Sequence, residues 1–272
     1  MDQKQKINNT VISVIIPAFK QEKTIQKDLL RIKDVLDQLR YDYEMIVVVD
    51  GTYDKTYENA KKAKSSKITV FGYENNHGKG FAIRYGMVRA KGAIVGFIDS
   101  GMDLNPNGLS ILLEEFEWKN ADIVIGSKRH SDSLVNYPFT RKVISFCSQI
   151  FIKVLFGLDV RDTQVGMKFF KREVLERVLP RLLVKRFAFD VEMLAVANYL
   201  GFRRIYEAPV DIRLHFGGTS TITSQKFLRT VLGMLIDTLA IFYRLKILNY
   251  YSDKNKRKWK YDPELQFRVN VG

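Results

Sequence analysis

The sequence has few of the residues and patterns that mark several common protein classes. It contains one cysteine, Cys147, which excludes an intramolecular disulfide and is typical of a reducing compartment. Its three histidines (77, 130 and 215) lack the spacing of zinc ligands. The motif G-x-S-x-G does not occur, and no Ser/His/Asp or Cys/His hydrolase signature is present. These absences argue against a disulfide-stapled protein, a zinc site and a hydrolase.

Long hydrophobic runs are also absent. A helix that crosses a bilayer needs roughly 18 or more predominantly apolar residues with few or no charges. The best candidate, residues 231–242, is shorter and contains Asp237. The first ten residues are polar and lack the apolar core of a signal peptide. We therefore expect neither a spanning helix nor a signal peptide.

Positive charge is in excess, because 44 Lys and Arg stand against 30 Asp and Glu and give a net charge of +14. Such an excess favours polyanions, namely nucleic acid, anionic lipid surfaces or phosphorylated small molecules. No helix-turn-helix, zinc-finger, RRM or KH signature is present, so we expect no nucleic-acid partner. The hydrophobic content of 46% permits one large domain, or one domain with a small appendage.

Apolar, β-branched runs alternate with helical patterns over the first two thirds of the chain. This rhythm predicts an α/β fold with a mostly parallel sheet and helices on both faces. Ligands of such sheets bind at the carboxyl ends of the strands. We expect Pro17, Asp50 and Asp99, each at the carboxyl end of a predicted strand, to face one crevice. The predicted strands are residues 11–19, 44–50, 67–73, 92–99 and 121–127.

Two carboxylates follow the fourth predicted strand, in GFIDSGMDLNPNG (96–108). Asp99 and Asp103, beside a basic crevice, would suit a hard cation that keeps waters and accepts substrate phosphates. Alternatively, one carboxylate caps the next turn and the other is solvated. Asp50 is expected to accept hydrogen bonds from a ribose or a base, or else to form an Asx-turn or a helix cap.

A lysine between glycines opens a predicted helix in NNHGKGFAIRYG (75–86). Backbone N–H groups, the helix dipole and Lys79 would all suit a diphosphate. A glycine cap followed by a surface lysine would explain the same pattern. The stretch is neither a Walker A motif nor G-x-G-x-x-G.

Seven segments, in order, resemble glycosyltransferase family 2 and its GT-A fold. The likeness is to polyprenyl-phosphate (dolichyl-phosphate) glucosyl- and mannosyltransferases. It covers about residues 11–222, so we expect a GT-A domain at 1–222 and an amphipathic helix with a basic tail at 223–272. The segments are VIIPAFKQEKTI (14–25), VVVDGTYDKT (47–56), NHGKGFAIRYGM (76–87), FIDSGMDLNP (97–106), GSKRHSDSLVNYP (126–138), DTQVGMKFFKREVL (162–175) and FAFDVEML (187–194).

The resemblance implies roles for individual residues. Asp99 would be the first carboxylate of a D-x-D site for Mg²⁺ or Mn²⁺, with Asp103 and Gln164 as further candidate ligands. Arg129 would contact a phosphate and, with Asp99 and Asp190, belong to the catalytic set. Asp190 would serve as a base for a hydroxyl acceptor, unless it caps a helix. The donor would be held by Pro17, Phe19, Glu22, Asp50, Lys79, Arg84 and Asp99.

The chain departs from the family pattern at two places. Gly101 stands where D-x-D has its second carboxylate, so the metal site either uses Asp103 or is weaker. The usual D-D-G after the second strand is shortened to Asp50-Gly51.

The resemblance implies an inverting enzyme that moves a hexose from a nucleotide sugar to polyprenyl phosphate. The DTQ-x-G-x-K-x-F pattern favours UDP-glucose over GDP-mannose. One alternative is a family 2 enzyme that acts on a hydroxyl of a glycan or cell-surface polymer. Another is a non-catalytic nucleotide-sugar-binding protein, which Gly101 favours.

Two amphipathic segments, residues 143–158 and 225–248, could reach a lipid acceptor without spanning the bilayer. Basic residues flank them, and the tail at 253–262 is basic as well. We expect a peripheral protein on an anionic membrane surface, at the cytoplasmic face. The alternative is that both helices pack on the catalytic domain or form a dimer face. The flanking residues are Arg141, Lys142, Arg244 and Lys246.

Overall fold

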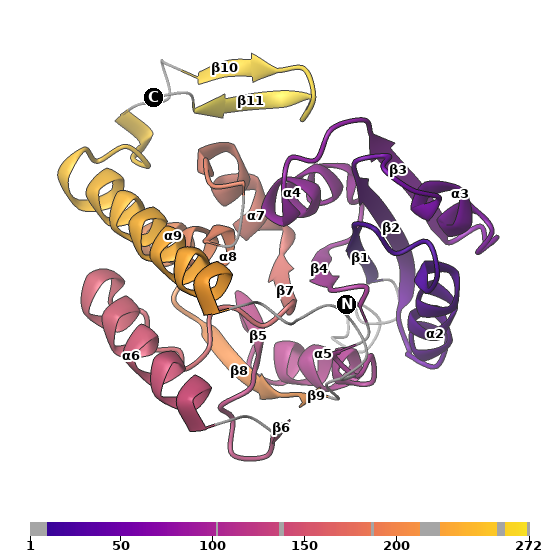
Figure 1. Ribbon diagram of the computed structural model, residues 1–272, viewed down its shortest axis with the longest axis horizontal. Coiled ribbons are helices and arrows are strands. Elements are labelled where there is room, and N and C mark those ends of the chain that lie inside the picture. Colours follow the sequence, from indigo (N-terminus) through magenta and orange to yellow (C-terminus); the bar gives the residue numbers. More distant parts are fainter. Residues whose placement is uncertain are drawn as a thin grey trace, which may run out of the picture.

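A seven-stranded sheet with helices on both faces forms the body of the protein (Figure 1). The computed structural model describes residues 10–101, 103–135, 139–185, 188–212, 224–254 and 259–270. The strand order is β3-β2-β1-β4-β7-β5-β8, and β7 alone of these strands runs antiparallel to its neighbours. The expected α/β class with a mostly parallel sheet is therefore confirmed. The strands are β1 (Val11–Ala18), β2 (Asp42–Asp50), β3 (Ile68–Tyr73), β4 (Ile94–Ile98), β5 (Ile123–Ser127), β7 (Met167–Lys171) and β8 (Ile205–Pro209).

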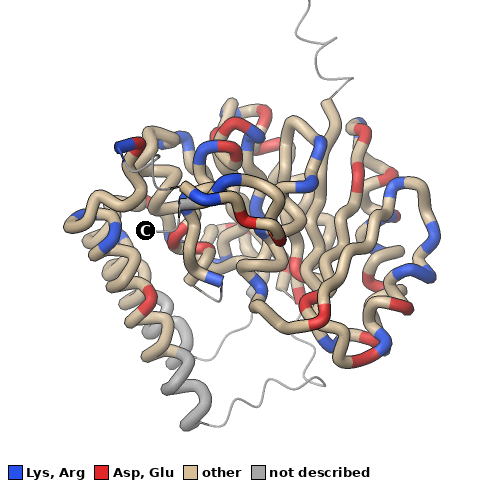
Figure 2. Tube along the Cα trace, turned by 90° about the horizontal axis from the view of Figure 1, so that it is seen from above, with Lys and Arg blue, Asp and Glu red and all other residues tan. Residues whose placement is uncertain are grey.

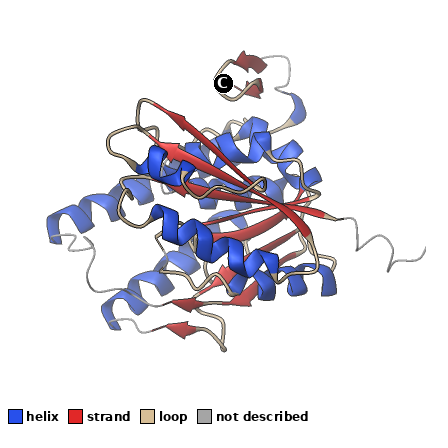
Figure 3. Cartoon of the chain, turned by 90° about the vertical axis from the view of Figure 1, so that its right-hand side faces the viewer, coloured by secondary structure: helices blue, strands red, loops and turns tan. Residues whose placement is uncertain are grey.

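Helices cover both faces of the twisted sheet, as Figure 3 shows. Neighbouring residues of β1 explain the two layers, because side chains alternate between the faces of a strand. Ile15 packs in the core beneath α4 and α8, whereas Val14 and Ile16 pack in the core beneath α2 and α5. The helices are α2 (Ile25–Asp37), α3 (Thr56–Lys61), α4 (Lys79–Arg89), α5 (Gly108–Trp118), α6 (Phe139–Phe156), α7 (Arg172–Val178), α8 (Phe189–Tyr199) and α9 (Ser224–Phe242).

The carboxyl ends of β1, β2 and β4 meet at one edge of the sheet, as expected. In the parallel register Ala18 lies beside Val49, and Ile15 lies beside Phe97. The Ser100 hydroxyl, just after β4, donates to the Pro17 carbonyl at 2.7 Å. Pro17, Asp50 and Asp99 are thus brought to the same edge.

The C-terminal part of the chain packs back onto the body that contains the sheet. A π-helical turn, η2 (Tyr243–Ile247), follows α9, and Ile241, Leu245 and Tyr251 are buried in the same core as α8. β10 (Trp259–Asp262) and β11 (Phe267–Asn270) form an antiparallel hairpin. The expected domain boundary between 222 and 223 lies outside the described residues, so the division into two domains stays a prediction.

Helices α6 and α9 lie side by side at one edge of the molecule (Figure 1). Their carboxyl-terminal ends meet where the rings of Phe156 and Phe242 pack edge-on, with centroids 6.4 Å apart. The described part of α9, at the left of Figure 2, carries few charged residues. Within the described ranges, no helix has both the length and the apolar character needed to cross a bilayer. Short strands, β6 (Leu134–Val135) and β9 (Asp211–Ile212), pair nearby.

Candidate active site

An ion pair between Lys79 and Asp99 lies at the carboxyl ends of the parallel strands. Asp99 directly follows β4, and Lys79 is the first residue of α4. The Lys79 Nζ lies 2.8 Å from Asp99 Oδ2, and the two side chains are 29% and 41% exposed. Burial lowers the pKa of Lys79, but the charges of Asp99 and Asp190 more than offset burial, so this pKa lies above its usual value. The Lys79 ammonium is therefore charged, and both side chains are within reach of solvent.

Close contacts at glycines bring the segments of the site together. The Asp99 backbone N–H donates to the Gly166 carbonyl at 2.9 Å, and a Cβ at Gly166 would lie 1.8 Å from Asp99 Oδ2. A Cβ at Gly80 would lie 2.5 Å from the Cβ of Phe189, which precedes Asp190. A side chain at Gly80 would collide with Phe189, and one at Gly166 would displace the Asp99 carboxylate. The G-K-G and D-T-Q-x-G patterns thus set the geometry around Asp99.

A second lysine, Lys168, is paired with Asp190 in the interior. Its Nζ lies 2.7 Å from Asp190 Oδ1 and donates to the Val165 carbonyl at 2.5 Å. Lys168 is 0% exposed, and burial lowers the pKa of its ammonium although Asp190 opposes this. Ala188 occupies the N-cap of α8, so Asp190 lies in the first turn and not at the cap. The sequence predicts no role for Lys168. The signal that could have pointed to it is a lysine within an apolar strand.

Asp50 holds the loop that precedes α4. Its buried carboxylate accepts hydrogen bonds from the Tyr73 hydroxyl, the Asn76 side chain and the backbone N–H groups of His77 and Gly78, at 2.8–3.0 Å. Burial and the charge of Asp50 raise the pKa of the Tyr73 hydroxyl. Two of the N–H groups expected to bind a diphosphate are thus used by Asp50. A contact between Asp50 and the donor stays a prediction.

Aromatic side chains stand exposed beyond β1 and β2. The rings of Phe19 and Tyr53 meet edge-on with centroids 6.0 Å apart, and they are 42% and 57% exposed. Lys20 Nζ lies 5.3 Å from the Phe19 centroid and 5.7 Å from the Tyr53 centroid. Glu22, also predicted to hold the donor, accepts a hydrogen bond from the Lys55 backbone N–H at 3.2 Å. Tyr53 was not predicted from the sequence, although it lies inside the V-V-V-D-G-T-Y segment.

Arg84 lies in the interior and does not join the group around Asp99. Its Nη1 donates to the Leu182 carbonyl at 2.8 Å, and its guanidinium lies 5.5 Å from the Phe267 ring centroid. Burial lowers the pKa of Arg84 to about 10. This arrangement links α4 to the C-terminal hairpin, and a role of Arg84 in donor binding stays a prediction.

Glu192 is a second buried anchor for the C-terminal segment. It accepts hydrogen bonds from the Tyr251 hydroxyl at 2.7 Å and from the backbone N–H groups of Leu183 and Val184. Burial raises the pKa of Glu192, although these hydrogen bonds oppose the shift. The acidic residues of F-D-x-E therefore have different partners, since Asp190 bonds to Lys168.

Two predicted site residues contact the amphipathic helices. The Arg129 guanidinium lies 5.3 Å from the ring centroid of Phe146 on α6. The Gln164 side-chain amide lies 4.0 Å from the sulfur of Met234 on α9. The neighbouring Lys128 pairs with Asp162 at 3.6 Å. The G-S-K-R-H and D-T-Q stretches thus border α6 and α9.

Oxygen ligands for a divalent cation are few. Within the described part of the chain, no three His, Cys, Asp or Glu side chains are grouped to hold a metal. Asp103 is exposed in the turn after β4. Mg²⁺ needs only one or two carboxylates when substrate phosphates supply other oxygens, so Asp99 fits such an ion in the presence of a diphosphate. Gly101 leaves room, because a Cβ there would meet only Gln21 Nε2, at 3.6 Å.

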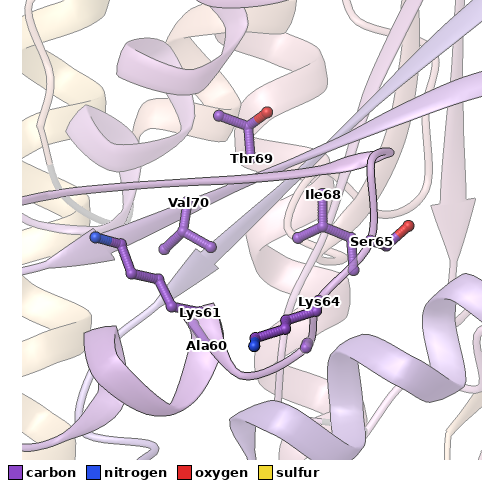
Figure 4. A pocket seen from close by; sticks show the side chains of 8 residues that line it. Ala60, Lys61, Lys64, Ser65, Ile68, Thr69 and Val70 are labelled. Carbon is purple, nitrogen blue, oxygen red and sulfur yellow. The ribbon is translucent and has the colours of Figure 1, made fainter.

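A surface pocket lies elsewhere, between the end of α3 and the edge strand β3 (Figure 4). Its lining includes Lys61 and Lys64 but no carboxylate. Lysines beside an edge strand commonly protect it from pairing with another chain. We therefore do not assign this pocket to the active site.

Comparisons with known proteins identify the family of the chain. The model of glycosyl transferase family 2 matches residues 13–179. The chain belongs to this family. It is 29% identical over 222 residues to a dolichyl-phosphate beta-glucosyltransferase of Dictyostelium discoideum, covering 74% of this chain and 66% of that protein. It is 33% identical over 205 residues to a Drosophila melanogaster protein of the same name, covering 70% and 63%.

A solved structure with the same fold is glucosyl-3-phosphoglycerate synthase from Mycobacterium tuberculosis, in complex with Mn²⁺, UDP and phosphoglyceric acid. Its TM-score is 0.63 at 22% identity, covering 86% of this chain and 78% of that one. The chain spans about two thirds of the length of the curated relatives it matches, 66% and 63% of the two proteins named above.

Proposed function

We propose that the chain is an inverting hexosyltransferase that moves glucose from UDP-glucose to polyprenyl phosphate. The observation that carries this proposal is the Lys79–Asp99 pair at the carboxyl ends of the strands, 2.8 Å apart and open to solvent. An oxygen ligand beside a lysine suits a nucleoside diphosphate that arrives with a divalent cation. Family membership and the names of the curated relatives support the same reaction.

Each group would have a separate task in the transfer. A cation held by Asp99 would neutralise the negative charge that builds on the diphosphate leaving group. Lys79 would bind phosphate oxygens directly, and Phe19 with Tyr53 would offer the base an apolar surface. The acceptor oxygen of a lipid phosphate is already ionised near neutral pH, so no general base is required. A single in-line displacement then inverts the anomeric carbon.

Asp190 fits a positioning task better than proton transfer in this scheme. Its carboxylate is buried and bound to Lys168 at 2.7 Å. A glycan hydroxyl as acceptor would need a base that is free to take a proton. The pairing of Asp190 therefore favours the phosphate acceptor over the hydroxyl acceptor.

The acceptor would reach the site along α6 and α9. Both helices expose large apolar side chains at intervals of three or four residues, which places these side chains on one stripe of each helix. Arg129 and Gln164 border these helices, at the place where a lipid phosphate would enter. We therefore propose peripheral binding to the cytoplasmic face of an anionic membrane. The exposed residues are Phe146, Ile150 and Val154 on α6 and Leu232, Leu235, Ile236 and Leu239 on α9.

The reaction is tested by transfer of labelled sugar into organic-extractable polyprenyl phosphate. UDP-glucose and GDP-mannose are supplied in parallel, with Mn²⁺ or with a chelator. We expect label from UDP-glucose only, and loss of transfer on chelation. Label from GDP-mannose alone would overturn the donor assignment. Absence of label from both, in protein that binds UDP, would overturn the acceptor assignment.

Membrane binding is tested by flotation with anionic liposomes at low salt. Ile236→Asp on α9 is expected to reduce flotation, because it places a charge on the apolar stripe. Ile111→Asp is a matched control, since Ile111 is similarly exposed on α5. Equal flotation of both variants and the parent would contradict the assignment of α9 to the membrane.

A further inference from the structure

Lys79 is in direct contact with the carboxylate proposed to hold a divalent cation. Its Nζ lies 2.8 Å from Asp99 Oδ2, which is a full ion-pair contact. The Asp99 carboxylate also packs against Gly166, and the Asp99 backbone N–H donates to the Gly166 carbonyl. A cation that approaches Asp99 therefore meets the ammonium of Lys79 at short range.

We propose that Lys79 is an internal counter-ion that keeps a divalent cation off Asp99 until the nucleotide arrives. The nucleoside diphosphate would draw the Lys79 ammonium to its own oxygens and release Asp99 for the cation. Metal and nucleotide would then bind cooperatively, each raising the affinity for the other. This inference rests on the proposed function, because it assumes a site for a nucleoside diphosphate and a divalent cation.

The position of Lys79 in α4 favours the exchange. It is the first residue of an 11-residue helix, where the helix dipole is positive and disfavours an ammonium. The charges of Asp99 and Asp190 offset this in the absence of ligand. A diphosphate is favoured at the same helix end, and it carries more negative charge than one carboxylate. The flexible stem of lysine lets its ammonium change partners without movement of the backbone.

Gly101 explains why the exchange is needed in this chain. A D-x-D pair has two carboxylates, so one can hold the cation while the other pairs with a lysine. Here the second position is Gly101, which has no side chain. Asp99 thus serves both partners, and the cation and Lys79 compete for it.

Lys168 cannot take part in this exchange. Its ammonium is fully buried and bound to Asp190 and the Val165 carbonyl. A buried charge without a partner is strongly unfavourable, so Lys168 stays where it is. Lys79 has 29% of its side chain exposed, so of these two lysines it is the one that can move.

The test measures Mn²⁺ binding to the full chain by electron paramagnetic resonance of the free ion, with and without UDP. A titration of Mn²⁺ with UDP alone corrects for their direct association. For the parent protein we expect weak Mn²⁺ binding that UDP strengthens by about tenfold or more beyond this correction. For Lys79→Met we expect nucleotide-free Mn²⁺ affinity to rise by about tenfold, because the competing charge is gone.

Two further variants test whether the positive charge at position 79 itself controls the affinity for Mn²⁺. Lys79→Arg keeps the positive charge and is expected to keep the weak nucleotide-free affinity. Lys33→Met removes another lysine that pairs with an aspartate, Asp37, on the surface of α2, and is expected to leave Mn²⁺ binding unchanged. Unchanged Mn²⁺ affinity in folded Lys79→Met, or equal affinity in Lys79→Arg and Lys79→Met, would overturn the inference.

The transfer assay distinguishes this inference from the proposed function. Cooperative binding of Mn²⁺ and UDP that is lost in Lys79→Met, without any glucose transfer, would overturn the proposed acceptor and support the inference. Glucose transfer together with a Mn²⁺ affinity that Lys79→Met does not change would overturn the inference alone.

Discussion

The lysine–aspartate pairs of the site differ in how far water reaches them. Lys79 and Asp99 are 29% and 41% exposed, whereas Lys168 and Asp190 are 0% and 7% exposed. Both N–O distances are short, 2.8 and 2.7 Å. Distance alone would make the pairs equivalent. Burial makes them different, because water screens the first pair and can replace either partner, whereas the second pair has no substitute partner.

This difference suggests that the two lysine–aspartate pairs have different roles. The buried pair fixes the start of α8 against β7, and its charges are held in place by the cost of leaving one unpaired. The accessible pair can open when a ligand offers a better partner. A site that binds charged ligands therefore has one pair for structure and one for exchange.

The largest expected effect is on stability, from Lys168→Met. Removing the ammonium leaves Asp190 buried without its partner, so the free energy of unfolding should fall by about 3–5 kcal/mol. Urea unfolding measures this change. The double variant Lys168→Met/Asp190→Leu should recover most of the loss, since neither charge remains. Lys79→Met, by comparison, should cost less than about 1 kcal/mol. Equal losses of unfolding free energy for Lys79→Met and Lys168→Met would contradict the distinction between the exposed pair and the buried pair.

A second effect is expected on transfer, from Gly166→Ala. The added methyl group would lie 1.8 Å from Asp99 Oδ2, so the carboxylate must move. We expect the transfer rate to fall by roughly a hundredfold, as for other small misplacements of catalytic groups. Gly233→Ala is the matched control, because a Cβ at Gly233 meets nothing within 4 Å. A rate near that of the parent for Gly166→Ala would contradict the fixed placement of Asp99.

The smallest expected effect is an increase in the affinity for Mn²⁺, from Gly101→Asp. The backbone leaves room for a side chain, and a second carboxylate would let the cation and Lys79 bind at the same time. We expect nucleotide-free Mn²⁺ affinity to rise by about tenfold, because affinity increases with the charge of the ligands. Gly101→Asn has the same shape without the charge and should change little. Equal affinities of the Asp and Asn variants would argue against this explanation.

Much of the fold and part of the site follow from local patterns. Alternating apolar strands and amphipathic helices predict the parallel sheet, and the rule for strand ends predicts that Pro17, Asp50 and Asp99 meet. Those predictions depend on backbone geometry that short segments determine. The tight approaches at Gly80 and Gly166 depend on tertiary packing, and the sequence shows them only as glycines within motifs.

Other features could not be predicted from the spacing of residues in the sequence. Arg84 follows Lys79 by five residues, which places it roughly 140° around the helix from Lys79. It therefore points into the core while Lys79 reaches Asp99. The sequence predicts only a basic tail after the last helix, yet the hairpin of β10 and β11 buries Leu265 and Val269 against Phe81. Such long-range packing has no local signal in the sequence.

The most direct test compares Asp99→Asn with Asp37→Asn in the transfer of label from UDP-glucose to polyprenyl phosphate. Both substitutions remove one carboxylate charge from an ion pair, but only Asp99 lies at the strand ends. The proposed function predicts a loss of about a hundredfold or more for Asp99→Asn and little change for Asp37→Asn. Transfer by a folded Asp99→Asn protein at the rate of the parent would contradict the central claim.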